Sequence, residues 1–406
     1  MKKKAVILGA GKSTRTLPLT ETRPKPLLYV AGKTILEHNL QNLIKIGVEE
    51  VVLVVGYLKE KLIQAVKNFD LPLKYHFVEQ KEPLGTAHAL KQVKNIGNLD
   101  SFLFLMGDDL YPQKDLEVLA KEERAILGFL RDDAFKFGVL EVKEGYLQSI
   151  TEKPEDIQKG IVNTGAYSLT KEIFSFLDVE PSARGEYEFT TSLDLYAKKF
   201  PVRVVLGSRW VPLTYPWSLL EVQRLLFQEL KPSHHEEVEI ESGATIKGPV
   251  HIGKGTIIRG GAYIEGPVWI GSQCIIGPNC YIRPYTTLGD SVKIGNACEV
   301  KESIFFPGVK MGHLSYVGDS VIGENVNLGA GTLVANLKHN NKNILTLING
   351  KYIDTGRRKL GAIIGDGAKL GIGTKIYPGR KLWPNTCTMV GEIIKKDCQK
   401  TKKLPF

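Results

Sequence analysis

Residues 264–294 read IEGPVWIGSQCIIGPNCYIRPYTTLGDSVKI, with an aliphatic side chain at every sixth position. The period continues on both sides of this stretch, and glycine often follows the aliphatic residue. A period of six predicts a triangular coil in which each hexad forms one side and the aliphatic side chains stack inside. The aliphatic positions are Ile246, Ile252, Ile258, Ile264, Ile270, Ile276, Ile282, Leu288, Ile294, Val300 and Phe306.

The fifth place of each hexad holds a small or β-branched residue. Cys274, Cys280 and Cys298 occupy this place, so we predict that they are interior packing residues. All five cysteines of the chain lie after residue 270 and none forms a CxxC pair. The sequence therefore predicts neither a disulfide framework nor a zinc cluster.

The regular period is interrupted twice. Its phase slips near Met311 and Val317, within a polar run that contains His313, and residues 335–363 form a long excursion. Long excursions from a regular solenoid are usually functional. A lone histidine is usually structural, but the disturbed repeat makes His313 a candidate functional residue.

Residues 1–231 follow a different pattern, in which short apolar runs alternate with amphipathic stretches. The expected strands are 5–8, 51–55, 73–78 and 102–106, and the expected helices are 34–46, 59–69, 86–93 and 221–230. This alternation predicts a parallel α/β sheet, and ligands of such sheets lie beyond the carboxyl ends of the strands. The loop after Leu8 and the acidic pair Asp108 and Asp109 should lie there.

The chain length of 406 residues suits two or three domains. We predict an α/β domain over 1–231, a polar linker over 232–240 and the coil over 241–406. The apolar run at 5–8 is too short for a signal peptide or a membrane span, which predicts a cytoplasmic protein. A net charge of +10 suits phosphorylated small molecules. Without a basic block with interleaved aromatics, no nucleic-acid partner is expected.

The segment after the first strand contains a Gly-Lys-Ser triplet at 11–13, but it is no P-loop because Val6 stands where that motif needs glycine. The whole run 9–20, followed by Arg23-Pro24-Lys25-Pro26, instead resembles the signature of sugar-1-phosphate nucleotidyltransferases. This resemblance extends through the domain and implies a Rossmann-like α/β fold.

The resemblance implies in-line attack of a sugar-1-phosphate on the α-phosphate of UTP or dTTP, with release of pyrophosphate. Arg15 would neutralise the pyrophosphate, Lys25 would hold the α-phosphate, and Asp108 would bind Mg²⁺. The implied nucleotide contacts are Leu8, Gly9, Gly11, Ser13, Thr14, Gln80, Gly85 and Thr86. The implied sugar and sugar-phosphate contacts are Gly138, Glu152, Lys153 and Asn163.

Two features depart from the family pattern. Ser13 replaces a glycine, which would be unfavourable if the position requires a positive φ. Pro212 and Ser218 stand where the family has aspartates, one of them the second metal ligand. A single carboxylate plus substrate phosphates can hold magnesium, and Asp109 is a possible assistant.

Residues 280–360 resemble the acetyltransferase half of bifunctional enzymes that make UDP-N-acetylglucosamine, and of their archaeal relatives. The resemblance implies a left-handed parallel β-helix of hexapeptide repeats, with acetyl-CoA as co-substrate. His313 would be the general base for the attacking amine, and Asn336 would orient the amine or the thioester. The implied sugar-phosphate contacts are Arg283, Lys301, Tyr316, Asn327 and Lys342. The implied acetyl-CoA contacts are Gly331, Arg357, Arg358 and Lys359.

Leu337 replaces a tyrosine of the bacterial pattern, and the run 357–361 is more similar to the archaeal relatives. In this family three chains pack by their coils, so a homotrimer or a dimer of trimers is expected. The resulting hypothesis is an enzyme that acetylates an amino-sugar 1-phosphate, with glucosamine-1-phosphate as first choice, and couples the product to UTP or dTTP. The sequence leaves gluco and galacto substrates open.

Two rival interpretations stay open. The first is a glucose-1-phosphate thymidylyl- or uridylyltransferase whose β-helix only assembles the oligomer. The second is a nucleotide-binding regulatory protein with a decayed first site, which the lost carboxylate at Pro212 favours. The His313 cluster argues against the first rival, whereas Arg15, Lys25, Asp108 and Lys153 together argue against the second.

Overall fold

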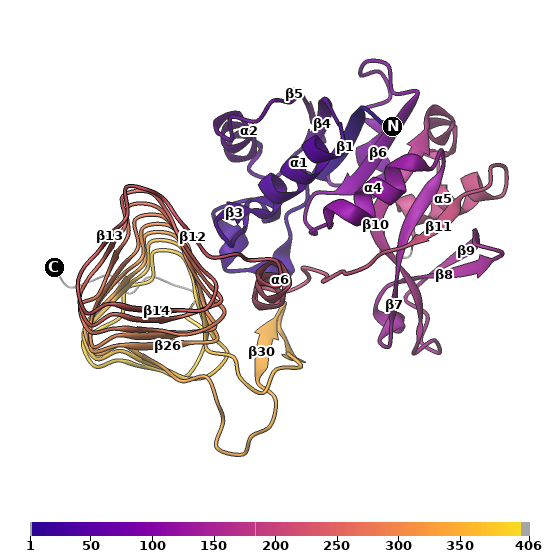
Figure 1. Cartoon of the computed structure of the whole chain (residues 1–406). Helices are drawn as coiled ribbons and strands as arrows, with labels where there is room; N and C mark the ends of the chain where they lie inside the picture. Colours follow the sequence, from indigo (N-terminus) through magenta and orange to yellow (C-terminus); the bar gives the residue numbers. More distant parts are fainter. Residues whose placement is uncertain (1, 183, 399–406) are drawn as a thin grey trace. The chain divides into compact units, whose positions relative to one another are not determined.

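The computed structural model describes residues 2–182 and 184–398 (Figure 1). The chain divides into two compact units. The first unit comprises Met1–Lys12, Pro24–Leu27 and Thr34–Pro212. The second unit comprises Ser13–Arg23, Leu28–Lys33 and Leu213–Phe406. The segment Ser13–Arg23 therefore packs with the coil-containing unit, which the sequence did not indicate.

The first unit is built on a sheet of nine strands. Its first part is parallel, in the order β5 (Lys74–Glu79), β4 (Glu50–Val55), β1 (Lys4–Gly9) and β6 (Ser101–Met106). It continues through β10 (Gly160–Thr170), β7 (Ala125–Arg131), β11 (Arg203–Leu206), β9 (Tyr146–Glu152) and β8 (Gly138–Lys143). Because β10 is antiparallel to both β6 and β7, the predicted parallel sheet is interrupted after the first four strands, and beyond β10 only β7 and β11 pair in parallel among the described strands.

Both faces of this sheet are covered. Val6, Val52 and Phe104 belong to one apolar core, and Ile7, Leu53 and Leu105 belong to another. Successive residues of a strand point to opposite faces, so an uninterrupted apolar strand is what a two-sided core requires. The covering helices are α1 (Ile35–Lys45), α2 (Lys59–Asn68), α3 (Thr86–Lys91), α4 (Gln113–Lys121) and α5 (Phe189–Ala197).

Short 3-10 turns and one small sheet complete the segments outside the coil. The turns are η1 (Thr14–Thr16), η2 (Leu19–Glu21), η3 (Lys25–Leu27), η4 (Ala134–Lys136) and η5 (Lys171–Phe176). The small sheet pairs β2 (Tyr29–Val30) with β3 (Lys33–Thr34). Among the described residues, no helix combines the length and the apolar character that crossing a membrane requires.

The second unit contains the predicted coil, whose short strands stack into three parallel sheets with a triangular outline (Figure 1). The first coil sheet contains β12 (Ser233–His234), β15 (Val250–Ile252), β18 (Val268–Ile270), β21 (Thr286–Leu288), β24 (Ile304–Phe305), β27 (Val321–Ile322), β32 (Ala362–Ile364) and β35 (Arg380–Leu382). The second contains β13 (Glu239–Ile240), β16 (Ile257–Ile258), β19 (Ile275–Ile276), β22 (Lys293–Asn296), β25 (Lys310–His313), β28 (Asn327–Leu328) and β33 (Lys369–Leu370). The third contains β14 (Thr245–Lys247), β17 (Tyr263–Glu265), β20 (Tyr281–Ile282), β23 (Glu299–Lys301), β26 (Tyr316–Gly318), β29 (Leu333–Val334), β34 (Lys375–Ile376) and β36 (Ile393–Ile394).

The phase slip of the repeat has a structural cause. Ile252 pairs with Ile270, eighteen residues on, whereas Leu288 pairs with Phe305, seventeen residues on. One residue is therefore lost just before β24, earlier than the sequence indicated. The hexad position assigned to Phe306 belongs to Phe305, which lies in the coil core, while Phe306 packs against the ring of Tyr29.

The interior of the coil matches the predicted packing. Cys274, Cys280 and Cys298 are buried free thiols in the apolar core. Burial raises the pKa of Cys274 and of Cys280 to about 12, so both stay protonated and unreactive near neutral pH. The predicted packing role of these cysteines is confirmed.

Helix α6 (Ser218–Phe227) and the long excursion complete the second unit. The excursion leaves the coil after β29 and contains the hairpin β30 (Leu345–Ile348) and β31 (Lys351–Asp354). It closes where the Leu360 N–H donates to the Asn336 carbonyl at 2.9 Å. Asn336 therefore stands at the base of the excursion, beside the regular coil.

Candidate active sites

The loop after β1 and the acidic turn after β6 lie at the same edge of the first unit's sheet. Leu8 is paired with Met106, and the Gly107 N–H donates to the Leu8 carbonyl at 2.9 Å. A Cβ on Gly107 would lie 2.6 Å from that carbonyl oxygen, so only glycine allows this approach. The edge thus gathers Gly9, Gly11 and Asp108, as expected for the carboxyl ends of neighbouring parallel strands.

Lys25 and Asp108 form an ion pair at this edge. The Lys25 ammonium lies 2.7 Å from the Asp108 carboxylate, and its side chain is buried whereas that of Asp108 is 39% exposed. Turn η3 holds Lys25 in place, because the Leu27 N–H donates to the Pro24 carbonyl at 2.9 Å. The residue predicted to hold the α-phosphate and the residue predicted to bind Mg²⁺ are therefore in direct contact.

Ser13 replaces a glycine of the family pattern, and its backbone adopts the left-handed conformation that glycine tolerates best, with φ +51°. Its carbonyl accepts hydrogen bonds from the Thr16 and Thr20 hydroxyls at 2.8 and 3.0 Å. These bonds hold a conformation that a side chain disfavours. Thr14 and Arg15 follow in turn η1, where both are exposed.

The predicted nucleotide contacts Gln80, Gly85 and Thr86 follow the end of β5. The buried Gln80 side-chain nitrogen contacts the Gly85 carbonyl at 3.1 Å and His88 Nδ1 at 3.0 Å. The bond to the Gly85 carbonyl identifies this atom as the amide nitrogen, and the amide oxygen is left as an acceptor. His88 was missed in the sequence, because a histidine in an amphipathic helix carries no motif.

Gly85 joins this segment to the loop at 185–188. A Cβ on Gly85 would lie 2.5 Å from the Tyr187 carbonyl oxygen, and its φ is +116°. The Tyr187 N–H donates to the Leu84 carbonyl at 2.8 Å, and the Thr86 hydroxyl accepts from the Phe189 N–H at 2.9 Å. The segment that contains Gln80, Gly85 and Thr86 and the loop at 185–188 are thus held side by side.

A cavity of 460 Å³ opens beside this loop, and its lining includes Glu152, Lys153, Arg184 and Glu188. Arg184 lies 2.8 Å from Glu188 and 3.4 Å from Glu152. Burial acts to raise the pKa of Glu188, but hydrogen bonds from Ser182 and Arg184 outweigh it and lower the pKa. The cavity therefore has a charged wall in which two predicted sugar contacts take part.

Asn163 and Gly138 lie on neighbouring strands of the same unit. The Asn163 amide donates to the Tyr167 hydroxyl at 2.7 Å, and its oxygen accepts from the Gly165 N–H at 2.9 Å. A Cβ on Gly138 would approach the Glu152 carboxylate to 3.0 Å and Asn163 Cβ to 3.8 Å. Gly138, Glu152 and Asn163 are therefore close together.

The coil carries a polar cluster where its phase is broken. The Asn336 amide nitrogen donates to the Tyr316 hydroxyl at 3.2 Å and to the Asp319 carboxylate. Lys301 Nζ donates to both Asp319 oxygens at 3.3 and 3.1 Å. Burial, followed by the charges of Asp319 and Glu299, raises the pKa of Tyr316, which stays a neutral hydroxyl. Two predicted site residues thus meet on one carboxylate, and the third, Tyr316, joins them through Asn336.

Asp319 was not among the predicted site residues, and neither was Gly318. Both belong to the polar run that breaks the hexad repeat. The break marks the region in the sequence, but it does not assign a role to either residue. A Cβ on Gly318 would lie 2.5 Å from the Tyr316 hydroxyl and 2.7 Å from the Asn336 amide nitrogen. Gly318 therefore provides the space that the cluster occupies.

His313 stands at the corner between the second and third coil sheets. Its side chain is exposed, its residue pairs with Asn296, and its carbonyl accepts from the Gly331 N–H at 3.1 Å. Asn327 lies on the second sheet and Tyr316 on the third, so they flank this corner. The described contacts place Gly331 next to His313 but join neither His313 nor Asn327 to the Asn336 cluster.

Arg283 and Lys342 lie outside the polar cluster. Arg283 stands one coil before Lys301 and pairs with Glu299 at 2.8 Å. Lys342 lies in the excursion, where its side chain is exposed and its N–H donates to the Asn340 side chain at 3.1 Å.

The three basic residues after the hairpin differ in their surroundings. Arg357 lies 2.8 Å from Glu302 and 3.7 Å from Glu221, and its side chain is only 13% exposed. Arg357 thus has a structural role in the described contacts. Arg358 is exposed, and Lys359 forms an isolated bridge with Leu337. Arg358 is accordingly the more accessible candidate for a coenzyme A phosphate.

The residues fit a magnesium site with one protein carboxylate. Asp108 offers hard oxygen ligands at the sheet edge, beside the Lys25 ammonium. Ser218 does not replace a missing ligand, because its hydroxyl accepts from the Tyr215 N–H at 3.3 Å at the start of α6. Pro212 offers no side-chain oxygen.

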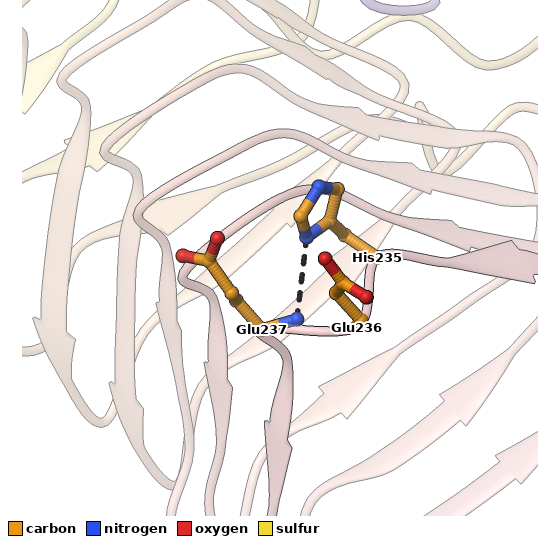
Figure 2. A group of neighbouring side chains, drawn as sticks. All are labelled: His235, Glu236 and Glu237. Atoms are coloured by element: carbon orange, nitrogen blue, oxygen red, sulfur yellow. Dashed lines mark hydrogen bonds between the residues drawn. The ribbon is translucent and has the colours of Figure 1, made fainter.

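A second group of possible ligands lies far along the chain, at the first turn of the coil (Figure 2). His235, Glu236 and Glu237 are all exposed, and the Glu237 N–H donates to His235 Nδ1 at 3.2 Å. Lys254 lies 2.9 Å from Glu237 and neutralises it. Exposed acidic groups are common, so we infer no metal site here.

Comparison with known proteins agrees with this geometry. The family model "Nucleotidyl transferase" matches residues 4–227, and "GMPPB C-terminal domain" matches residues 264–376. "Bifunctional protein GlmU" of Methanococcus maripaludis is 41% identical over 90% of this chain and 88% of its own. "Bifunctional sugar-1-phosphate nucleotidylyltransferase/acetyltransferase" of Sulfurisphaera tokodaii is 37% identical over 89% of this chain and 90% of its own. "UTP--glucose-1-phosphate uridylyltransferase AglF" of Haloferax volcanii is 38% identical over 47% of this chain and 82% of its own.

The fold and the two sites thus define a nucleotidyltransferase with a hexapeptide-type coil behind it. The chain belongs to the family of bifunctional sugar-1-phosphate nucleotidyltransferase/acetyltransferase enzymes.

Proposed function

We propose that the chain N-acetylates an amino-sugar 1-phosphate with acetyl-CoA in its coil and transfers a uridylyl group to the acetylated sugar in its α/β unit. Glucosamine-1-phosphate and UTP are the proposed substrates. The observation that carries the proposal is the polar cluster of Lys301, Tyr316 and Asn336 around Asp319, because a coil that served only for assembly would not need it.

In the α/β unit, Lys25 is the proposed main source of positive charge for the triphosphate. Lys25 lies at the sheet edge beside Asp108, where a triphosphate would meet the backbone N–H groups of the glycine loop. A buried ammonium stabilises the charge that develops on the α-phosphate during in-line attack. Arg15, exposed in turn η1, is the proposed partner of the leaving pyrophosphate.

Gln80 is the proposed contact for the nucleobase. Its amide nitrogen donates to the Gly85 carbonyl, so its oxygen is left to accept a hydrogen bond. Uracil and thymine both offer a ring N–H donor, so UTP and dTTP are both compatible. The uridylyltransferase name of the Haloferax volcanii relative supports UTP.

Magnesium, held by Asp108 and the substrate phosphates, would neutralise phosphate charge and favour departure of pyrophosphate. Asn163, Glu152 and Lys153 would bind the sugar and its phosphate near the 460 Å³ cavity. The charged and hydroxyl-bearing wall of that cavity suits a hydroxylated substrate better than an apolar one.

In the coil, His313 is the proposed general base and Asn336 the proposed orienting residue. A histidine can take the proton of the attacking amine at neutral pH. Lys301 and Arg283 are proposed to bind the sugar phosphate, together with Tyr316, Asn327 and Lys342. Gly331 and Arg358, with Lys359, are the proposed acetyl-CoA contacts.

We also propose that three chains pack by their coils, which would complete the acetyltransferase site. Three coils at the His313 corner carry exposed apolar side chains, namely Leu314, Ile372 and Val390, which are 65%, 61% and 76% exposed, with the coil of Ala330 between those of Leu314 and Ile372. An apolar stripe of this kind suits burial against a second copy of the chain. Light scattering coupled to size-exclusion chromatography should give a trimer or hexamer mass, and a monomer mass would refute this arrangement.

The test of the proposed function measures both half-reactions on one protein sample. With Mg²⁺, UTP and N-acetylglucosamine-1-phosphate should release pyrophosphate, with dTTP as comparison. Acetyl-CoA and glucosamine-1-phosphate should release free coenzyme A, with galactosamine-1-phosphate as comparison. His313→Ala should abolish coenzyme A release and leave pyrophosphate release intact.

The alternatives give different outcomes in the same experiment. Acetylation without pyrophosphate release from either nucleotide would mean that the α/β unit only binds nucleotide. Pyrophosphate release without acetylation would mean that the coil serves only for assembly.

A further inference from the structure

Asp319 occupies a site in the coil that is fixed on all sides. It follows strand β26 with φ +51°, and its side chain is only 2% exposed. Its N–H donates to the Lys301 carbonyl at 2.9 Å, and its carbonyl accepts from the Gly361 N–H at 2.8 Å. The carboxylate therefore cannot move without disturbing the coils before and after it.

Among the described residues, the hydrogen bonds that this carboxylate accepts come from proposed site residues. Lys301 Nζ approaches both of its oxygens, and the Asn336 amide nitrogen donates to one of them. A buried carboxylate is costly unless it is paired and hydrogen-bonded. Asp319 meets this requirement entirely through two side chains to which the proposed function gives substrate contacts.

The hydrogen-bond count fixes the orientation of Asn336. An amide nitrogen has two hydrogens, and those of Asn336 are directed to the Asp319 carboxylate and the Tyr316 hydroxyl. An ionised carboxylate only accepts hydrogen bonds. If the Asn336 amide rotated by half a turn, its oxygen would face the Asp319 carboxylate oxygen, and the two would repel each other. Tyr316 alone would not prevent that rotation, because a hydroxyl can donate as well as accept.

We propose that Asp319 is the positioning residue of the acetyltransferase site, which holds the Asn336 amide with its oxygen free for substrate and holds the Lys301 ammonium in place. This inference rests on the proposed function of the coil. Asp319 itself contacts no substrate in this scheme and acts through its two neighbours.

The two arms of this role predict different kinetic effects. Loss of the Asn336 orientation misplaces a group beside the reacting atoms and lowers kcat. Loss of the Lys301 contact weakens binding of the sugar phosphate and raises its KM. A purely structural carboxylate would instead lower the fraction of folded protein and leave both constants of the folded fraction unchanged.

The experiment is a double-mutant cycle on the full chain, with acetyl-CoA and glucosamine-1-phosphate as substrates. Asp319→Asn keeps the size of the side chain and should lower kcat by about 10–100-fold, as is typical when the residue that orients a ligand is removed. In an Asn336→Ala background the same substitution should change kcat by less than about 3-fold, because the group on which it acts is already gone.

Glu302→Gln is the matched control. Glu302 is a buried carboxylate 3.6 Å from Lys301, but its other recorded partners are Arg224 and Arg357 rather than Asn336. This variant should keep the kcat of the unaltered protein, and thermal unfolding should define the folded fraction of every variant. The inference is overturned if Asp319→Asn keeps kcat within about 3-fold, or if the kcat effects of Asp319→Asn and Asn336→Ala multiply. Absence of acetylation by the unaltered chain would refute the proposed function, and this inference with it.

Discussion

Addition of one methyl group at Gly318 tests whether the polar cluster is the acetyltransferase site. The new Cβ would lie 2.5 Å from the Tyr316 hydroxyl, 2.7 Å from the Asn336 amide nitrogen and 3.0 Å from Tyr316 Cζ. Ordinary contacts begin near 3.4 Å, so these two side chains must each move by up to about 1 Å. The backbone is no obstacle, because Gly318 is not among the residues with a positive φ in the described chain.

A displacement of that size next to reacting groups costs about 100-fold in rate. Overpacking usually costs about 1–3 kcal/mol of stability. Gly318→Ala should therefore stay folded and lose about 99% of its acetyltransferase kcat/KM, measured as coenzyme A release. Pyrophosphate release by the same sample should be unchanged.

Gly312→Ala controls for the methyl group itself. Gly312 lies in the neighbouring strand β25, and a Cβ there would meet nothing within 4 Å. Its thermal midpoint should equal that of the unaltered chain. If Gly318→Ala keeps more than half of the acetyltransferase activity, the cluster is not at the reaction centre and the reasoning fails.

Three further predictions concern the other ion pairs and the metal. Lys25→Met leaves Asp108 without its cation and should lower pyrophosphate release more than about 100-fold, while coenzyme A release serves as the unaffected control. Removal of divalent cations with EDTA should stop pyrophosphate release and spare coenzyme A release, and Mg²⁺ should restore the former. Burial acts to raise the pKa of Glu302, but the hydrogen bond and charge of Arg224, with Arg357 and Lys301, outweigh it and lower the pKa. The carboxylate therefore stabilises the fold above the unfolded pKa and loses this effect as pH falls through the folded pKa. Glu302→Gln should lower the free energy of unfolding in urea by about 3 kcal/mol at pH 7. The difference between the variant and the unaltered chain should shrink as pH falls below about 4.5. A difference independent of pH would contradict the stabilising role of the Glu302 carboxylate.

Several parts of the fold could be predicted because they depend on local periodicity. Stacked coils bury the same position of every hexad, so the aliphatic positions and the interior cysteines were readable directly. Strands β1, β4 and β6 were recognisable because both faces of their sheet are covered, which demands uninterrupted apolar runs.

Other features could not be predicted, because they depend on partners far apart in the sequence. The antiparallel strand β10 and the packing of Ser13–Arg23 with the coil-containing unit are set by such contacts. The lost residue before β24 was misplaced, because Phe305 and Phe306 are equally apolar and only the strand register distinguishes them.

The same division holds for the active sites. The sequence by itself determined the family resemblance and the chemical identity of the site residues, since motif spacing follows from the local backbone around each ligand. Only the tertiary structure decided that Lys25 meets Asp108, that Arg357 is tied to Glu302, and that Asp319 joins Lys301 to Asn336. These pairs connect coils or strands that are distant in the chain, and hydrogen-bond geometry exists only once those segments have packed.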